Sequence, residues 1–281
     1  MKRIIALITL VALVVVFCGS ADAQILWRGA KTMKQGSFIA MGEWYYINYT
    51  KQWNTTDEKW DDLASGVSSS KWGFETMFGY AITNDWEAHL HVPIKFWKSE
   101  SGGVENSESG LGDICFKTRY AVMPWAKDTH GLTLTGHIRL GTGDKNKGLG
   151  DETTDFGISA IFSTAWMGKS RGHLKANYWI NGENDDNFKP GNELKVILKY
   201  DYNYSPKLMP FVTFIPYMVA EKENDGNAVT DSDKTRYTFV LGGVFKPQKG
   251  IFVRPKIAFA LGGKTGNNYS FKPVLDLWYI F

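Results

Sequence analysis

The 281-residue sequence has very little cysteine, with Cys18 and Cys115 as the only two. Cys18 lies in an apolar N-terminal run, so a chain processed after residue 23 keeps Cys115 alone. A single cysteine excludes an intramolecular disulfide and any zinc or redox framework built from several cysteines. The excess of basic over acidic residues is also small, at a formal net charge of +3, and predicts no nucleic-acid partner.

Long hydrophobic runs are missing beyond the N-terminus. The first 23 residues carry Lys2 and Arg3, then an apolar run over 4–17, then small residues ending at Ala23, which are the three parts of a secretory signal peptide. The run is about 14 residues long, short of the roughly 20 that span a bilayer as a helix. We therefore expect a cleaved signal peptide over residues 1–23 and a single mature domain over residues 24–281.

Aromatic residues, by contrast, are abundant. They make up 15% of the chain, although its mean hydropathy is only −0.26. Strands that alternate lipid-facing and lumen-facing residues average to such values, and a chain without a spanning helix crosses a membrane only as a closed barrel. Alternation with a period of two predicts twelve strands, with ten or fourteen as alternatives, over residues 38–53, 71–82, 86–97, 111–123, 132–143, 156–166, 173–182, 193–204, 208–221, 236–246, 251–262 and 269–281.

The connections between these segments alternate in length. Tight turns such as 83–85 and 205–207 alternate with long polar connections, and a short one over 263–268 ends the long series. Long external loops and short periplasmic turns on an even number of strands are typical of outer-membrane proteins. The predicted fold class is all-β: an antiparallel transmembrane β-barrel that follows an N-terminal signal peptide. A soluble β-sandwich is the structural alternative.

The last predicted strand ends the chain on an aromatic residue. Its apolar face resembles the closing strand of bacterial outer-membrane barrels and is formed by Leu275, Leu277, Tyr279 and Phe281. We expect the barrel-assembly machinery to recognise this strand and to insert the chain into outer-membrane lipid. The expected product is a monomer integral to the bacterial outer membrane.

Charged residues identify the inner face of each predicted strand. An Arg or Lys at the lipid midplane costs roughly 2 to 4 kcal/mol, so these side chains must point into the lumen. Their parity predicts a polar, crowded and mildly electropositive lumen lined by Glu75, Glu87, His89, His91, Lys95, Asp113, Lys117, Arg119, His137, Arg139, Lys175, Trp179, Lys195, Lys199, Asp201, Arg236, Arg254, Lys256, Lys272 and Asp276. Two compatible interpretations are ion pairs that stiffen a small barrel and a narrow pore that attracts anionic solutes.

The first and ninth predicted strands do not show a clean alternation. In the first strand Glu43 shares its parity with Ile39 and Tyr45. Pro210 and Pro216 interrupt the ninth strand, and they predict a bulge or a locally opened wall in that strand.

The tryptophans fall into two groups. Trp179 has the parity of lumen residues. The other tryptophans near strand ends are interpreted as interfacial girdles: Trp27, Trp44, Trp53, Trp72, Trp86, Trp97, Trp125, Trp166 and Trp278.

Two histidine patterns bear on metal binding and catalysis. His89 and His91 could bind a metal with Glu75 or Asp113 as a third ligand, but hydrogen-bonded lumen histidines are far commoner. A lipid-modifying hydrolase needs a base beside a serine, and His173 near Ser170 lies at the wrong end of the barrel for outer-leaflet lipid. We predict no enzyme activity, no catalytic residue, no metal and no cofactor.

Two glycine-rich blocks carry a family resemblance. The sequence over 110–113 followed by 117–120, GLGD and KTRY, and the sequence over 140–157, LGTGD with GLG and TDFG, are similar to blocks of the phenol meta-pathway degradation family of outer-membrane proteins. Gly141 stands where that family has proline. The resemblance implies a barrel that takes up small, often aromatic or hydrophobic compounds, and it carries over no catalytic residue.

The predicted function is an outer-membrane channel or transporter for passive or facilitated passage of a small-molecule solute. Roughly eight strands leave an interior filled by side chains and roughly 16 to 18 leave a broad channel, so a barrel of intermediate size suits a narrow passage. The alternatives are a non-conducting structural or adhesive barrel that acts through its extracellular loops, and a lipid-modifying hydrolase.

Overall fold

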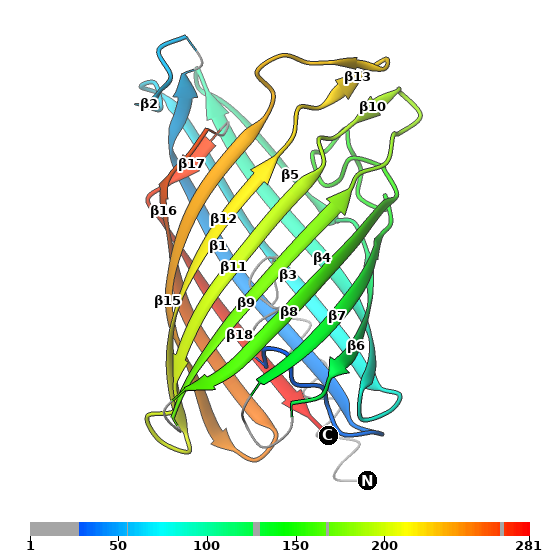
Figure 1. Ribbon diagram of the computed structural model, residues 1–281. Helices are drawn as coiled ribbons and strands as arrows, with labels where there is room; N and C mark the ends of the chain where they lie inside the picture. The colour runs from blue at the N-terminus through cyan, green and yellow to red at the C-terminus, as the bar shows by residue number, and fades with distance from the viewer. Residues whose placement is uncertain (1–27, 55, 126–129, 167–168, 265–266) are drawn as a thin grey trace, which may run out of the picture.

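The computed structural model describes residues 28–54, 56–125, 130–166, 169–264 and 267–281. Twelve antiparallel strands form a closed barrel, which Figure 1 shows with long loops at one end and short turns, with the C-terminus, at the other. The wall strands are β1 (Phe38–Asn54), β3 (Val67–Ala81), β4 (Trp86–Ser101), β6 (Cys115–Met123), β7 (His130–Arg139), β8 (Asp155–Trp166), β9 (Ser170–Ile180), β11 (Glu193–Tyr202), β12 (Leu208–Val219), β15 (Lys234–Gln248), β16 (Ile251–Gly262) and β18 (Phe271–Ile280).

The barrel closes because β1 pairs with β3 on one edge and with β18 on the other. The final residue takes part in this closure: the Phe281 N–H donates to the Phe38 carbonyl oxygen at 2.9 Å, and the two rings are 5.8 Å apart. The predicted barrel of twelve strands is confirmed, and a sandwich is excluded. The predicted signal peptide lies outside the described residues.

Three short strands extend the wall at the loop end. β2 (Lys59–Asp62) and β17 (Asn267–Tyr269) pair with β1, and β5 (Val104–Leu111) pairs with β4. A separate three-stranded sheet joins β10 (Phe188–Lys189), β13 (Glu223–Asn224) and β14 (Asn227–Ala228) above the rim. No helix in the described part of the chain is long and apolar enough to cross a membrane.

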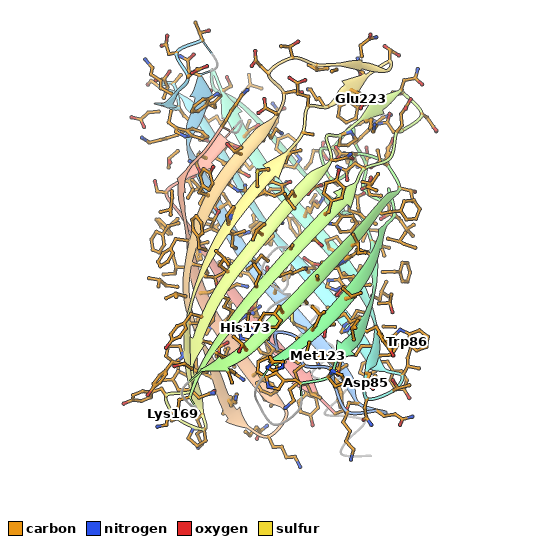
Figure 2. All side chains as sticks on the ribbon, viewed as in Figure 1. Asp85, Trp86, Met123, Lys169, His173 and Glu223 are labelled. Carbon is orange, nitrogen blue, oxygen red and sulfur yellow. The ribbon has the colours of Figure 1, made fainter. Side chains whose placement is uncertain are left out.

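The two faces of the wall are inverted relative to a soluble protein. On β6, Phe116 and Tyr120 are 48% and 57% exposed on the outside, whereas Lys117 and Arg119 are each 8% exposed and point inward. Figure 2 shows side chains projecting from the outer surface around the whole visible wall. A surface with apolar side chains outside and charged side chains inside is stable only where lipid surrounds the barrel.

The first strand follows strict parity, contrary to the expectation. Ile39, Met41, Glu43 and Tyr45 are all buried, so its inward face is largely apolar. These residues continue into a cluster on the inner wall that includes Met77, Phe211, Val240 and Trp278. The lumen, predicted to be polar, therefore also has one apolar side.

Some tryptophans are also not where the girdle interpretation put them. Trp72 and Trp86 are exposed on the outer surface, but Trp278 is buried inside and stacks on Phe252 at 5.4 Å. Trp125 packs against Ala30 and Ile161, and Trp27 lies outside the described residues.

The ninth wall strand, β12, has no bulge. Its pairing with β15 keeps one register through Pro210 and Pro216, and its register with β11 is the same above and below Pro216. The register shifts of this region lie instead between β15 and β16. The strand is not displaced at either proline, so the bulge is a wrong prediction, and the alternative of a locally opened wall stays a prediction.

Candidate functional site

The N-terminal segment, defined here as residues 28–34, lies inside the turn end of the barrel, where Figure 1 draws it in dark blue. The Ala30 N–H donates to Ser163 Oγ at 2.8 Å, and Thr133 Oγ1 donates to the Ala30 carbonyl oxygen at 2.5 Å. Arg119 Nη2 donates to the Gly29 carbonyl oxygen at 2.9 Å. Three wall strands therefore hold the backbone of a segment that occupies the periplasmic end of the lumen. No pattern in the sequence indicated this placement.

Glu87 is the principal anchor of the N-terminal segment. Its buried carboxylate accepts hydrogen bonds from Arg28 Nη2 at 2.5 Å and from the Met33 N–H. The wall supplies two further contacts, from Arg119 Nη1 at 3.3 Å and His89 Nε2 at 2.9 Å. One carboxylate thus joins the segment to β4 and β6.

A serine, a histidine and an aspartate line up beside the same segment. Ser163 Oγ lies 2.7 Å from His173 Nδ1, and His173 Nε2 lies 2.8 Å from Asp201 Oδ2. The network assigns the ring proton to Nε2, which donates to Asp201, so that Nδ1 accepts from Ser163 while Ser163 accepts from Ala30. This chain of hydrogen bonds fixes the Ala30 backbone to the wall.

The arrangement does not resemble an accessible hydrolytic centre. Ser163 is fully buried, and Asp201 is also held by Arg171 at 2.7 Å and Lys199 at 2.8 Å. An acyl substrate would have to take the space of Gly29 and Ala30. The sequence paired His173 with Ser170, but Ser170 Oγ instead lies 2.9 Å from the Tyr200 hydroxyl.

Substitution of Gly29 tests whether the N-terminal segment obstructs the lumen. Gly29 has φ of +59°, and a Cβ there would lie 2.2 Å from His173 Nδ1 and 2.4 Å from Ser163 Oγ. We expect Gly29→Ala to weaken docking of the segment by about 1–3 kcal/mol of backbone strain plus the clash, and to raise single-channel conductance. Gly36→Ala is the matched control, because Gly36 also has positive φ but nothing within 4 Å. Equal conductance in the two variants would contradict an obstructing role.

Ion pairs fill the middle of the lumen. Lys256 Nζ donates to Glu43 Oε2 at 2.8 Å and to Asp276 Oδ1 at 3.1 Å, while Arg254 Nε also donates to Asp276. All four side chains are buried. On the neighbouring strands β3 and β4, His91 Nδ1 lies 2.9 Å from Glu75 Oε1. Paired charges of this kind fit the stiffening interpretation of the lumen residues.

The glycine-rich blocks fold an external loop over the mouth. The Gly143 N–H donates to Asp113 Oδ1 at 2.9 Å, and Lys95 donates to the Leu149 carbonyl oxygen. A Cβ at Gly150 would lie 2.3 Å from Asp113 Oδ1, so this approach requires glycine. The blocks that carry the family resemblance therefore hold a loop against the wall.

A second contact ties this loop to its neighbour. Lys145 Nζ donates to Asp186, and this hydrogen bond raises the pKa of the Lys145 ammonium above its ordinary value. Below it, Arg139 Nε donates to Asp155 Oδ2 at 2.6 Å and Nη2 to Glu193 Oε1 at 3.0 Å, with the guanidinium 4.8 Å from the Trp179 ring. The mouth is narrowed on the β7–β11 side.

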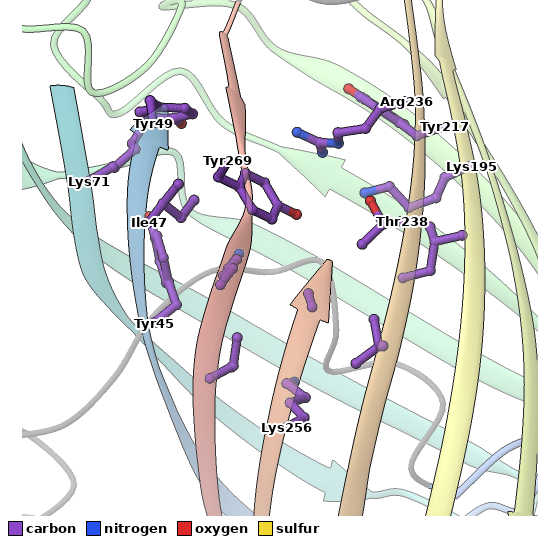
Figure 3. Close-up of a pocket in the computed structure, with 15 residues that line it drawn as sticks. Tyr45, Ile47, Tyr49, Lys71, Lys195, Tyr217, Arg236, Thr238, Lys256 and Tyr269 are labelled. Carbon is purple, nitrogen blue, oxygen red and sulfur yellow. The ribbon is translucent and has the colours of Figure 1, made fainter. Parts of the chain in front are cut away.

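An open cavity of about 210 Å³ remains on the other side of the mouth. Figure 3 shows Arg236 and Lys195 entering it from one wall and Tyr269 facing them from the other. This mouth cavity is lined by Tyr45, Ile47, Tyr49, Lys71, Lys195, Ile215, Tyr217, Arg236, Thr238, Val240, Lys256, Ala258, Tyr269, Lys272 and Val274. Its lower end adjoins the apolar inner wall through Val240, Ala258 and Ile215.

The predicted lumen residues fall into three levels, and none of their side chains is exposed. Near the N-terminal segment lie Glu87, His89, Arg119, Lys199 and Asp201; in the middle lie Glu75, His91, Lys117, His137, Lys175, Arg254, Lys256 and Asp276; and near the mouth lie Lys95, Asp113, Arg139, Trp179, Lys195, Arg236 and Lys272. Their action on a solute stays a prediction. Sequence reasoning missed Tyr45, Tyr49, Tyr217 and Tyr269, although the shared parity of residues 43–49 could have indicated the first two.

The histidines do not assemble a metal site in the part of the chain that the structure describes. His91 is engaged by Glu75, and His89 by Glu87. No group of three or more His, Cys, Asp or Glu side chains among the described residues could hold a metal ion.

The sequence profile of the family described as "Putative MetA-pathway of phenol degradation" matches residues 88–269. The chain belongs to this family. The matched region runs from β4 through the two glycine-rich blocks to β17, so it includes most of the wall and the loop that covers the mouth. No curated protein matches the sequence.

Solved structures similar to this family member are outer-membrane barrels. The COG4313 outer membrane channel from Pseudomonas putida F1 aligns with a TM-score of 0.77 and 14% identity, over 93% of this chain and all of that one. The β domain of the Bordetella autotransporter Brka gives 0.54 and 10% identity, over 89% and 100% of the two chains. The KdgM porin gives 0.50 and 6% identity, over 86% and 99%. At these identities the likeness shows the fold alone: this chain is an outer-membrane β-barrel of the kind found in channels and porins.

Proposed function

We propose that this protein is an outer-membrane channel through which small organic molecules enter the periplasm by a passive or facilitated route. The observation that supports it is the mouth cavity, which opens at the loop end and continues into an apolar inner wall formed by Met77, Phe211, Val240 and their neighbours. Inorganic ions are not stabilised by an apolar wall, whereas an organic solute is stabilised when its apolar surface leaves water and contacts the wall.

The charged wall opposite this apolar strip supports passage of selected solutes rather than bulk flow. Lys117 on β6 and Lys175 on β9 lie on this side, so a solute passes between an apolar strip and a polar one. A solute with one apolar face and one polar end matches this arrangement, and aromatic compounds are one such class. The solved channel from Pseudomonas putida F1, with its related fold, makes a channel the first function to test.

A non-conducting barrel is the competing function, and the N-terminal segment is the observation that favours it. Residues such as Ala30 and Met33 fill the periplasmic end of the lumen, and the loops narrow the mouth. In that case the loops would act on an external partner.

We propose that the protein assembles as a monomer, and that the assembly machinery recognises the closing strand that ends at Phe281.

The deciding experiment compares the refolded protein and the Gly29→Ala variant in planar bilayers. We expect discrete single-channel openings in both, smaller in the unaltered protein, because the N-terminal segment occupies part of its lumen. Folding is verified by the heat-dependent electrophoretic shift of the barrel. A barrel that folds but gives no openings even as Gly29→Ala would overturn the channel proposal and favour action through the loops.

A further inference from the structure

The mouth cavity has an unusual charge balance for a lumen full of ion pairs. Five of its fifteen lining residues are Lys or Arg, and no lining residue is Asp or Glu. Lys256 is neutralised from behind by Glu43 and Asp276. For Lys71 and Arg236, no ion pair with a carboxylate is formed within the described residues. The cavity therefore carries a net positive charge in a confined space, where it attracts anions more strongly than the same charges would in bulk water.

Of the cationic side chains in the cavity, Arg236 indicates most specifically which anion would bind. Its side chain is half-buried on β15, and its Nε atom is buried without a hydrogen-bond partner in the described structure. A buried donor without a partner costs free energy that an entering acceptor recovers. The planar guanidinium also matches the two oxygens of a carboxylate, so a carboxylate is the acceptor that fits this position.

Aromatic rings alternate with the cations. Lys195 Nζ and the Arg236 guanidinium lie 4.8 and 5.3 Å from the Tyr217 ring, and Lys272 Nζ lies 4.3 Å from the Tyr45 ring. Tyr49 and Tyr269 complete the lining, with Ile47 and other aliphatic side chains at its base. Tyrosine faces stack against planar rings, so the cavity offers both a counter-charge and an aromatic platform.

We propose that the mouth cavity is a binding site for small aromatic carboxylate anions. A neutral aromatic ring would leave Lys71 and Arg236 without a carboxylate partner, and a simple inorganic or aliphatic anion would leave the tyrosine rings unused. The inference deepens the proposed channel function by naming a solute class, and it rests on that function only for what happens after binding. Bound solute sits at the loop end, above the ion-paired middle of the lumen.

Calorimetric titration of the folded protein in detergent tests binding separately from transport. Benzoate carries both features of the ligand, acetate the charge alone, benzyl alcohol the ring alone, and benzylamine the ring with the opposite charge. We expect benzoate to bind more tightly than the other three by about tenfold or more, the value of one charge-assisted hydrogen bond or one ring contact. Equal binding of benzoate and benzyl alcohol, or of benzoate and acetate, would overturn the inference.

Substitutions locate the site. Arg236→Gln and Lys71→Gln are each expected to weaken benzoate binding by about tenfold. Tyr217→Leu should weaken benzoate binding but not acetate binding. Lys98→Gln is the matched control, since it removes one cation from an exposed position paired with Glu105, outside the cavity. Unchanged benzoate binding in both Arg236→Gln and Lys71→Gln, with folding verified, would place the ligand elsewhere and overturn the proposal.

Single-channel recording with benzoate separates this proposal from the channel proposal. Benzoate binding without any current would uphold the site and reject the channel. Current that benzoate does not interrupt, in a protein that gives no calorimetric signal, would uphold the channel and reject the site.

Discussion

Glu87→Gln is expected to release the N-terminal segment from the lumen and to raise single-channel conductance. The Glu87 carboxylate is fully buried and neutralises Arg28 at 2.5 Å and Arg119 at 3.3 Å. Without its charge, two guanidinium groups face each other in a confined space, and one of them belongs to the segment. Removing one partner of a buried ion pair costs about 3–5 kcal/mol, and the segment can avoid this cost by leaving.

Conductance in planar bilayers measures the effect, and protease cleavage near Arg28 reports the position of the segment. Glu105→Gln is the matched control, because Glu105 is an exposed carboxylate paired with Lys98 at 2.6 Å, and such pairs contribute about 0–1 kcal/mol. We expect Glu87→Gln and Gly29→Ala to act alike, although one alters the wall and the other the segment. Higher conductance in Gly29→Ala alone would mean that Glu87 stiffens the wall without retaining the segment.

Asp276→Asn is expected to cause the largest loss of stability. Asp276 lies on the closing strand β18 and accepts from both Arg254 and Lys256, with all three side chains buried inside the barrel. Asparagine keeps the shape but leaves two buried cations to share Glu43. We expect the free energy of unfolding to fall by about 3–5 kcal/mol, because a buried charge without its partner stays desolvated.

Urea unfolding in lipid vesicles, followed by tryptophan fluorescence, measures this loss. Trp278 lies 5.2 Å from the Arg254 guanidinium, so its emission should also shift in the folded variant. Asp62→Asn is the control, because Asp62 is 85% exposed and 3.6 Å from Lys51, and its loss should cost no more than about 1 kcal/mol. Equal stability of the two variants would show that the lumen ion pairs do not hold the barrel together.

The wall of the barrel was predictable from the sequence for a local physical reason. On a strand, neighbouring side chains point to opposite faces, and lipid rejects charge, so the alternation of Phe116 with Lys117 and of Arg119 with Tyr120 assigns both faces at once. The same rule misled where the inner face is apolar. Ile39 and Met41 share a parity with Glu43, and the alternation of side chains alone does not predict that all three point into the lumen, as they do in the structure.

What sequence determined is thus the strand count, the order of loops and turns, and the face of each charged residue, since each depends on residues close together in the chain. Tertiary structure decided which of those residues meet. Lys256 reaches Glu43 across 213 positions, and Ala30 reaches Ser163 across 133, because the closed wall brings distant strands to face one lumen. The N-terminal segment and the cationic tyrosine-lined cavity exist only through those encounters, and no pattern with a period of two records them.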